Sequence, residues 1–217
     1  HARRGGDGLV YSHVSESVFM TTYSFADVIL NGEQYNKKDL ATLDRPKFRA
    51  EFMPSNTGVP QFLLPTLTKF QQAGQEKMPG AEFLAFPLLH DVICCPAYLG
   101  RDTLQLLRQC RSVMHQFGVA QAQFLPYWSN AGEMVLTPPE AAVSAYLGAE
   151  GRSLLLIAQG PREPVTLQLE LRGRLAQLCG LPARDALSRA ALQWRESKLV
   201  WPLPGSAVQM AVIEPAH

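Results

Sequence analysis

Side chains that can carry out chemistry gather around two short apolar runs near the start of the chain. Asp27 and Glu33 flank an apolar core at residues 28–30, while His13 and Ser15 end the run just upstream. Two carboxylates and a histidine in such positions are typical of a polar site that is carried on the ends of buried strands. The pattern indicates a class of chemistry, but it does not name a substrate.

Three strand-like segments would position these side chains. Residues 8–15 predict a short, largely buried strand of the kind found in parallel sheets. Residues 25–30 form a second apolar run, which an Asn-Gly turn signal closes. Residues 47–53 alternate between apolar and charged side chains, so we expect a third strand that carries Glu51.

The middle of the chain has helical character. Apolar residues recur at helical spacing from 61 to 75, and residues 81–92 predict either a buried helix with Pro87 near its start or parts of two elements. The clearest helix covers residues 101–117, where apolar side chains recur at threes and fours and Gly118 supplies the terminator.

From residue 141 onward the apolar pattern changes to a period of two. Several short strands separated by hairpin-type turns predict an antiparallel β-sandwich. Thr137, Pro138 and Pro139 mark the change, so we expect two domains, residues 1–137 and residues 138–217. The expected strands lie at residues 143–147, 153–158, 165–171, 192–194, 199–203 and 208–212.

Bulk properties argue against several classes of function. The chain has 217 residues, of which 47% are hydrophobic, and this is ample for a core. The net charge is +1 and the basic residues are scattered, so neither a nucleic acid nor an anionic membrane is indicated as a partner. No apolar run is as long as a membrane helix, and the first residues are too polar for a signal peptide.

Cofactor and metal sites are not predicted. The sequence lacks the Gly-rich nucleotide loops, the GxSxG motif of serine hydrolases and the HExxH motif of zinc enzymes. His13, Asp27, Glu33 and His90 do not have the spacing of metal ligands. The four cysteines form no disulfide or CxxC pattern and are expected to be buried reduced thiols, which leaves the cellular compartment open.

Short motifs follow one another along the chain in a characteristic order: YSHVS, SFADVILNGEQY, FRAEF, FLPYW and SAYLGAEGRSLLLIAQGPREPVTLQLEL. In this order they resemble the C-terminal part of bacterial glycoside-hydrolase-like proteins. The resemblance implies α/β plus all-β architecture, with the C-terminal portion of a TIM-type (β/α)8 barrel followed by a small antiparallel β-sandwich. Only about three or four of the eight barrel strands fit, so the others would come from an N-terminal segment, another chain or a second copy.

The resemblance also implies a location for the site. Barrel enzymes keep their chemistry at the carboxyl ends of the strands, so His13, Ser15, Asp27, Glu33 and Glu51 would lie at or near a sugar-binding cleft. Glu33 and Asp27 would be the catalytic carboxylates, one as acid and the other as base or nucleophile. Six positions separate them, which is too far on one straight strand. Either the turn between them brings them together or one pairs with a carboxylate on another strand, and we favour the second arrangement.

Each of these residues also has a structural interpretation. Asp27 can cap a loop, Glu33 can be a solvated turn residue, and His13 can be a structural histidine. Tyr127 and Trp128 have aromatic faces that suit the apolar face of a pyranose, and they equally suit packing between two domains.

Two hypotheses about function follow. The leading one is a carbohydrate-active protein that forms part of a glycoside hydrolase and uses carboxylate acid/base chemistry. The competing one is a non-catalytic carbohydrate-binding or assembly subunit that keeps the glycosidase scaffold. Neither predicts a cofactor. The first predicts turnover of a carbohydrate by the complete protein, whereas the second predicts that the protein binds sugar without releasing product, or binds none and only associates with a partner.

Overall fold

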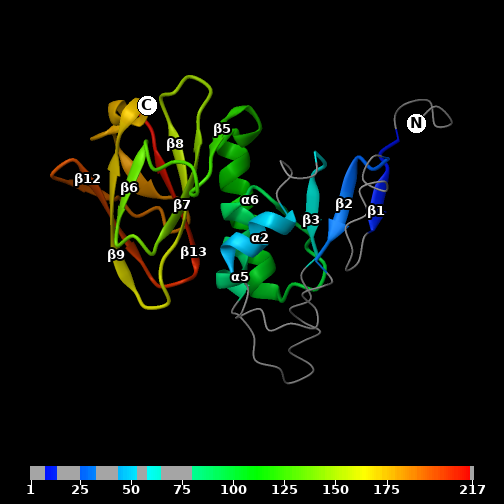
Figure 1. The fold of residues 1–217 in the computed structure, drawn as a ribbon. Helices are drawn as coiled ribbons and strands as arrows, with labels where there is room; N and C mark the ends of the chain where they lie inside the picture. Colours follow the sequence, from blue (N-terminus) through cyan, green and yellow to red (C-terminus); the bar gives the residue numbers. More distant parts are fainter. Residues whose placement is uncertain (1–7, 14–24, 33–43, 53–57, 65–79, 216–217) are drawn as a thin grey trace. The chain divides into compact units, whose positions relative to one another are not determined.

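The computed structural model describes residues 8–13, 25–32, 44–52, 58–64 and 80–215 (Figure 1). The chain is a mixed α/β structure that divides into two compact units. The first unit lies within His1–Gly80 and Phe86–Leu104, and the second comprises Ala81–Ala85 and Gln105–His217.

The first unit is built on a parallel sheet. Within the described residues its strands are β1 (Tyr11–His13), β2 (Val28–Asn31), β3 (Gln61–Leu63) and β4 (Ile93–Cys94), which pair in chain order. Every neighbouring pair is parallel. The carboxyl ends of all four strands therefore lie along the same side of the sheet, which we call its carboxyl edge.

Strand β1 confirms the parallel strand that was expected at residues 8–15, but it is less buried than expected. Leu9 is 72% exposed and Tyr11 is 50% exposed. The reason is that β1 is an outer strand of the sheet, which pairs with β2 alone among the described strands. An apolar run at a sheet edge has the same sequence pattern as one in the middle.

The strand expected at residues 47–53 is wrong, because this segment forms helix α2 (Arg45–Phe52). The Asp44 carboxylate accepts a backbone N–H of the first turn at 2.6 Å and caps the helix. Phe48 and Phe52 are both buried and stack with ring centroids 4.6 Å apart. Residues four apart share a helix face, so the spacing that resembled strand alternation also satisfies a helix.

The helix expected from residue 61 is also wrong at its start, since residues 61–63 form β3. Gln61 and Leu63 are buried on alternate positions, and β3 is held between β2 and β4. Residues 65–75 of the expected helix lie outside the described residues. The pairing of β3 on both sides is a tertiary effect, which helical spacing in the sequence does not report.

Two helices contribute to both units. Helix α5 (Gly80–Leu89) matches the buried helix expected at residues 81–92, although Pro87 lies near its end. Helix α6 (Arg101–Phe117) has the bounds that the sequence predicts, and Gly118 follows it with a left-handed φ of 81°. No helix in the described ranges combines the length and apolarity needed to cross a membrane.

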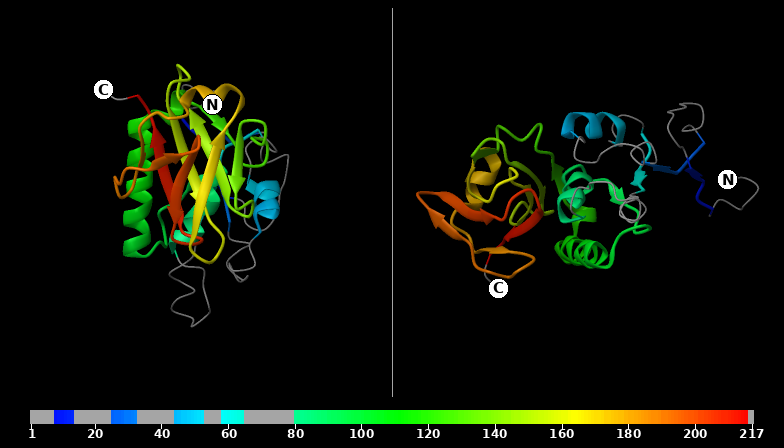
Figure 2. Two further views of the ribbon diagram at one scale, coloured as in Figure 1. Left: turned by 90° about the vertical axis from the view of Figure 1, so that its left-hand side faces the viewer. Right: turned by 90° about the horizontal axis from the view of Figure 1, so that it is seen from below.

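The second unit contains two antiparallel sheets that face each other across a shared core (Figure 2). Trp201 is fully buried there, among leucines that both sheets contribute. The five-stranded sheet has the order β10-β13-β8-β7-β5 and the four-stranded sheet has the order β11-β12-β9-β6. The bounds are β5 (Gln123–Leu125), β6 (Met134–Thr137), β7 (Ala142–Leu147), β8 (Leu154–Gln159), β9 (Val165–Leu171), β10 (Ala183–Asp185), β11 (Gln193–Arg195), β12 (Lys198–Leu203) and β13 (Val208–Ile213), with short 3-10 helices at Val119–Gln121 and Gly173–Leu178.

The six strands expected after residue 141 are present as β7, β8, β9, β11, β12 and β13. Strands β5, β6 and β10 were not expected. The boundary proposed at residues 137/138 falls between β6 and β7, and β5 and β6 pair with β7 and β9, which lie after it.

None of the four cysteines forms a disulfide. Cys94 and Cys110 are buried, whereas Cys95 and Cys179 are half-buried. Burial raises the pKa of the Cys110 thiol to about 12, so this side chain stays protonated at neutral pH.

Candidate functional site

The carboxyl edge of the parallel sheet brings residues from different strands to the same level. His13 on β1 is in register with Leu30 on β2, and Asn31 on β2 is in register with Leu63 on β3. Leu63 is in turn aligned with Cys94 on β4. His13 is exposed and ends β1 at this edge, which is where it was predicted to lie.

An amide pair fixes the end of β2. The buried Asn31 side chain donates from Nδ2 to Gln61 Oε1 at 3.0 Å, and its Oδ1 accepts the Gly32 N–H at 2.8 Å. The Gln61 Nε2 donates to the backbone carbonyl of Glu51 at 3.2 Å. Because the network satisfies each buried amide and joins β2, β3 and α2, it holds this edge rigid.

Glu51 does not lie on a strand at the carboxyl edge, as was expected, because residues 45–52 form α2. Its side chain is half-buried on the helix, and its backbone carbonyl is the group that the sheet contacts. Glu51 is on a helix because Phe48 and Phe52, the buried anchors of α2, are four residues apart and share one helix face.

Gly32 directly follows β2 and precedes Glu33 in the sequence. Its φ is +119°, and a Cβ at this position would lie 2.9 Å from Leu63 Cδ1 and 3.1 Å from the backbone N of Leu64. Only glycine fits both the conformation and the space. Glu33 itself lies outside the described residues, as does Ser15.

Asp27 lies at the opposite end of the sheet from His13. It immediately precedes β2, and its Oδ2 accepts the Val10 N–H at 2.7 Å while its own N–H donates to the Val10 carbonyl at 2.8 Å. Three residue steps along the strands separate this level from His13, or roughly 10 Å. The structure therefore does not bring Asp27 and His13 together.

His90 is buried in the core of the first unit. Its Nδ1 lies 2.7 Å from the Phe86 carbonyl oxygen, and its ring centroid is 5.0 Å from that of Phe48. Burial is the main cause that lowers the pKa of the imidazole, the Arg45 and Arg49 guanidinium groups also lower it, and backbone hydrogen bonds oppose the shift, so that the pKa is about 4. The neutral ring is a core element at physiological pH.

Tyr127 and Trp128 lie in the second unit, in the loop after β5. The Tyr127 N–H donates to the Ser144 hydroxyl at 3.1 Å, and the buried Asn130 side chain donates to the Val143 carbonyl at 2.8 Å. The Tyr127 and Trp128 rings meet edge to face at 5.0 Å and both are half-buried. The loop thus presents partly exposed aromatic faces from a fixed base.

The sequence interpretation did not identify Asn31 or Gln61. The sequence signal for Asn31 is an amide side chain that follows an apolar run and directly precedes a glycine. Such a residue usually marks a turn, but at the end of a buried strand its amide can also form hydrogen bonds that fix the strand. Within the described part of the chain, no group of three His, Cys, Asp or Glu side chains is arranged to hold a metal ion.

Comparison with solved structures shows what this fold is similar to. An α-amylase from Anoxybacillus aligns with a TM-score of 0.59 and 11% identity, over 98% of this chain and 54% of that one. An α-amylase from Geobacillus thermoleovorans, complexed with acarbose, aligns with a TM-score of 0.60 and 12% identity over the same shares. A GH27 β-L-arabinopyranosidase from Geobacillus stearothermophilus, in complex with arabinose, gives 0.56 and 12% over 97% and 59%.

No protein-family model and no curated protein matches the sequence. This chain spans between 54% and 59% of the length of the three structures named above. At this level of identity the similarity concerns the fold. It confirms, for the fold, the resemblance to glycoside-hydrolase-like proteins that the sequence motifs predict.

Proposed function

We propose that this chain is the C-terminal part of a carbohydrate-active, glycoside-hydrolase-like protein. The first unit is the final portion of a (β/α) barrel, and the antiparallel sheets of the second unit form the β-sandwich that follows it. The observation that carries the proposal is the parallel order β1-β2-β3-β4 followed by two antiparallel sheets, which aligns over 98% of this chain with two α-amylases.

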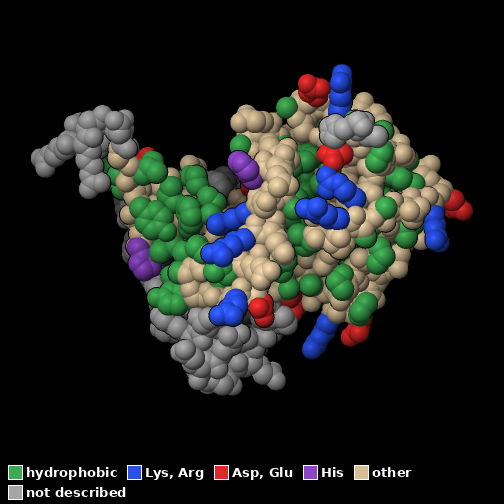
Figure 3. Space-filling model, turned by 180° about the vertical axis from the view of Figure 1, so that it is seen from behind, with side chains coloured by type: hydrophobic (Ala, Val, Ile, Leu, Met, Phe, Trp, Pro, Cys, Tyr) green, Lys and Arg blue, Asp and Glu red, His purple; other side chains and the backbone are tan. Residues whose placement is uncertain are grey.

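Further strands complete the barrel beside β1. The outer side of β1 has no partner among the described strands, and Leu9, Tyr11 and Phe25 around it are 72%, 50% and 78% exposed. Figure 3 shows hydrophobic side chains gathered on the surface of this unit. An N-terminal segment, another chain or a second copy would cover this surface and pair with the free edge.

The sugar-binding cleft lies at the carboxyl edge, with His13 as a cleft residue and Glu33 as one catalytic carboxylate. Asp27 lies at the amino edge and bonds to Val10. This supports the arrangement in which the partner of Glu33 comes from a strand that completes the barrel. Tyr127 and Trp128 are proposed to stack on sugar rings from the second unit.

The test is glycosidase turnover by the complete protein, measured on a panel of aryl glycosides. Glu33→Gln is expected to reduce kcat at least about 100-fold, because it removes an acid/base group from the reacting bond. Asp27→Asn is expected to leave kcat within a few-fold, since its carboxylate is at the far edge. Glu150→Gln, at an exposed carboxylate of the second unit, is the matched control.

Turnover that is undiminished in Glu33→Gln would overturn the assignment of that residue. A complete protein that binds oligosaccharides but releases no product from any of them would instead identify the non-catalytic binding or assembly role.

A further inference from the structure

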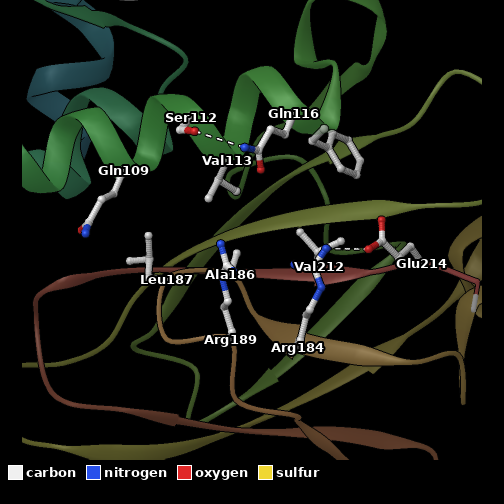
Figure 4. Close-up of a pocket in the computed structure, with 11 residues that line it drawn as sticks. Gln109, Ser112, Val113, Gln116, Arg184, Ala186, Leu187, Arg189, Val212 and Glu214 are labelled. Atoms are coloured by element: carbon white, nitrogen blue, oxygen red, sulfur yellow. Dashed lines mark hydrogen bonds and ion pairs between the residues drawn. The ribbon is translucent and has the colours of Figure 1, made fainter.

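A groove on the second unit lies outside both proposed sugar-binding regions. Its volume is about 490 Å³, which is within the usual range for sites that take small molecules. All of its lining residues belong to the second unit, on α6, on β13 and the residue directly after it, and on the segment from β10 through the following turn (Figure 4).

One wall of the groove is a polar face of α6. Gln109, Ser112 and Gln116 lie on this face with Val113 between them. Gln116 Nε2 donates to the Ser112 hydroxyl at 3.3 Å. From Gln109 to Gln116 the row extends roughly 10 Å along the helix axis, so its amides and hydroxyl can reach groups on two successive sugar rings.

The opposite wall carries arginines. In Figure 4 the side chains of Arg184 and Arg189 extend from the sheet side toward α6. The Arg184 guanidinium pairs with Glu214 at 2.6 Å, whereas Arg189 makes no ion pair within the described part of the chain. Two arginines and one glutamate leave the groove with a net charge of +1, and this charge is on Arg189.

The turn that carries Arg189 is held firmly. The buried Asp185 carboxylate accepts the Leu187 N–H at 3.1 Å, the Ser188 N–H at 2.7 Å and the Ser188 hydroxyl at 2.9 Å. The Arg189 N–H donates to the Asp185 carbonyl at 2.8 Å. A guanidinium on a fixed turn is suited to a planar carboxylate, because less freedom is lost when the two groups pair.

We propose that this groove binds an acidic oligosaccharide, with a uronate carboxylate on Arg189 and the sugar hydroxyls along the Gln109–Gln116 row. Val113, Leu187 and Val212 offer apolar surface to the C–H faces of the rings. The inference concerns a site apart from the cleft of the proposed glycosidase, and it is measured by binding alone, so it stands or falls separately from turnover.

The test uses the 217-residue chain and calorimetric titration with digalacturonate. Binding is expected, and it should weaken as salt is added. Cellobiose, a neutral disaccharide, is expected to bind at least about tenfold more weakly, because it cannot form the charge-assisted pair with Arg189.

Variants locate the site. Arg189→Gln is expected to weaken digalacturonate binding about tenfold or more, and Arg189→Lys to restore only part of the loss because it keeps the charge without the planar fork. Gln109→Ala is expected to weaken binding a few-fold. Arg152→Gln, at an arginine whose side chain is 77% exposed outside the groove, is the matched control, and thermal unfolding confirms that each variant is folded.

Four results would overturn the proposal. The first is absence of digalacturonate binding, the second is equal binding of cellobiose, and the third is digalacturonate binding that Arg189→Gln leaves unchanged. The fourth is displacement by sodium sulfate at the same concentration as the sugar acid, which would reduce the groove to a general anion site.

Discussion

His90 shows how burial determines the charge of a single residue. Its ring is fully buried, contacts the Phe86 carbonyl and lies against Phe48. Burial lowers the pKa of the folded state to about 4 from an ordinary value of 6.5. Between these two pH values the unfolded chain binds a proton that the folded chain does not, so folding becomes less favourable as pH falls through this window.

We therefore predict that the free energy of unfolding decreases by up to about 3 kcal/mol between pH 7 and pH 4 because of His90 alone. His90→Gln does not titrate and should show a correspondingly smaller decrease. The measurement is urea unfolding at both pH values, with His115→Gln, at an exposed histidine, as the control. If the pH dependence of His90→Gln equals that of the original chain, the buried neutral histidine is not its source.

The position of Asp27 shows what the sequence does not determine at this scale. The apolar run was expected to start at Phe25, which would place Asp27 inside the strand, but β2 starts at Val28. A shift of three residues moves the carboxylate from the body of the strand to its amino end. Strand ends depend on pairing with a neighbour, here Tyr11 with Val28, and the local sequence does not contain that information.

Elements with a strong and long period were predictable. Helix α6 has its expected bounds because seventeen residues repeat one helical pattern, and β9 was expected because Val165 to Leu171 alternate strictly. Strands β5, β6 and β10 have only three or four residues each and form by pairing with distant partners. Their sequences are too short for a period, and for the same reason the groove beside β10 could not be predicted.

The turn after β10 depends on one buried carboxylate. Besides its three bonds within the turn, Asp185 accepts the indole N–H of the fully buried Trp201 at 3.3 Å. Asp185→Ala is predicted to lower the free energy of unfolding by about 2–4 kcal/mol, because it leaves buried donors without an acceptor. Asp185→Asn should cost less, since one side-chain oxygen can still serve the turn.

Chemical denaturation measures both losses, and Glu163→Ala, at an exposed carboxylate of the second unit, is the control. The same substitutions should weaken digalacturonate binding, because Arg189 follows the turn directly. A stable Asp185→Ala protein with unchanged unfolding would show that the turn does not need this carboxylate.

At the scale of the whole molecule, the two units differ in how complete their cores are. The second unit encloses its core between two sheets, with Trp201 and its neighbouring leucines inaccessible. Among the described residues, every large hydrophobic side chain that is exposed belongs to the first unit: Leu9, Tyr11, Phe25, Ile93 and Tyr98. Exposed apolar area promotes association, above all beside a strand edge such as that of β1, which has no partner among the described strands on one side.

This difference predicts that the 217-residue chain self-associates through its first unit. Replacing Leu9 and Phe25 together with lysine should shift the chain toward monomer in sedimentation experiments over a range of concentrations, because charge at a free edge opposes pairing. Ala120→Lys with Gln121→Lys adds the same charge at exposed positions of the second unit and should have little effect. On the proposal that further strands complete the barrel, Leu9 and Phe25 would be covered in the longer protein. The same double substitution should then destabilise that protein, whereas the control pair should not. A 217-residue chain that is monomeric throughout, or a complete protein indifferent to both pairs, would contradict the view that this surface is one side of an unfinished barrel.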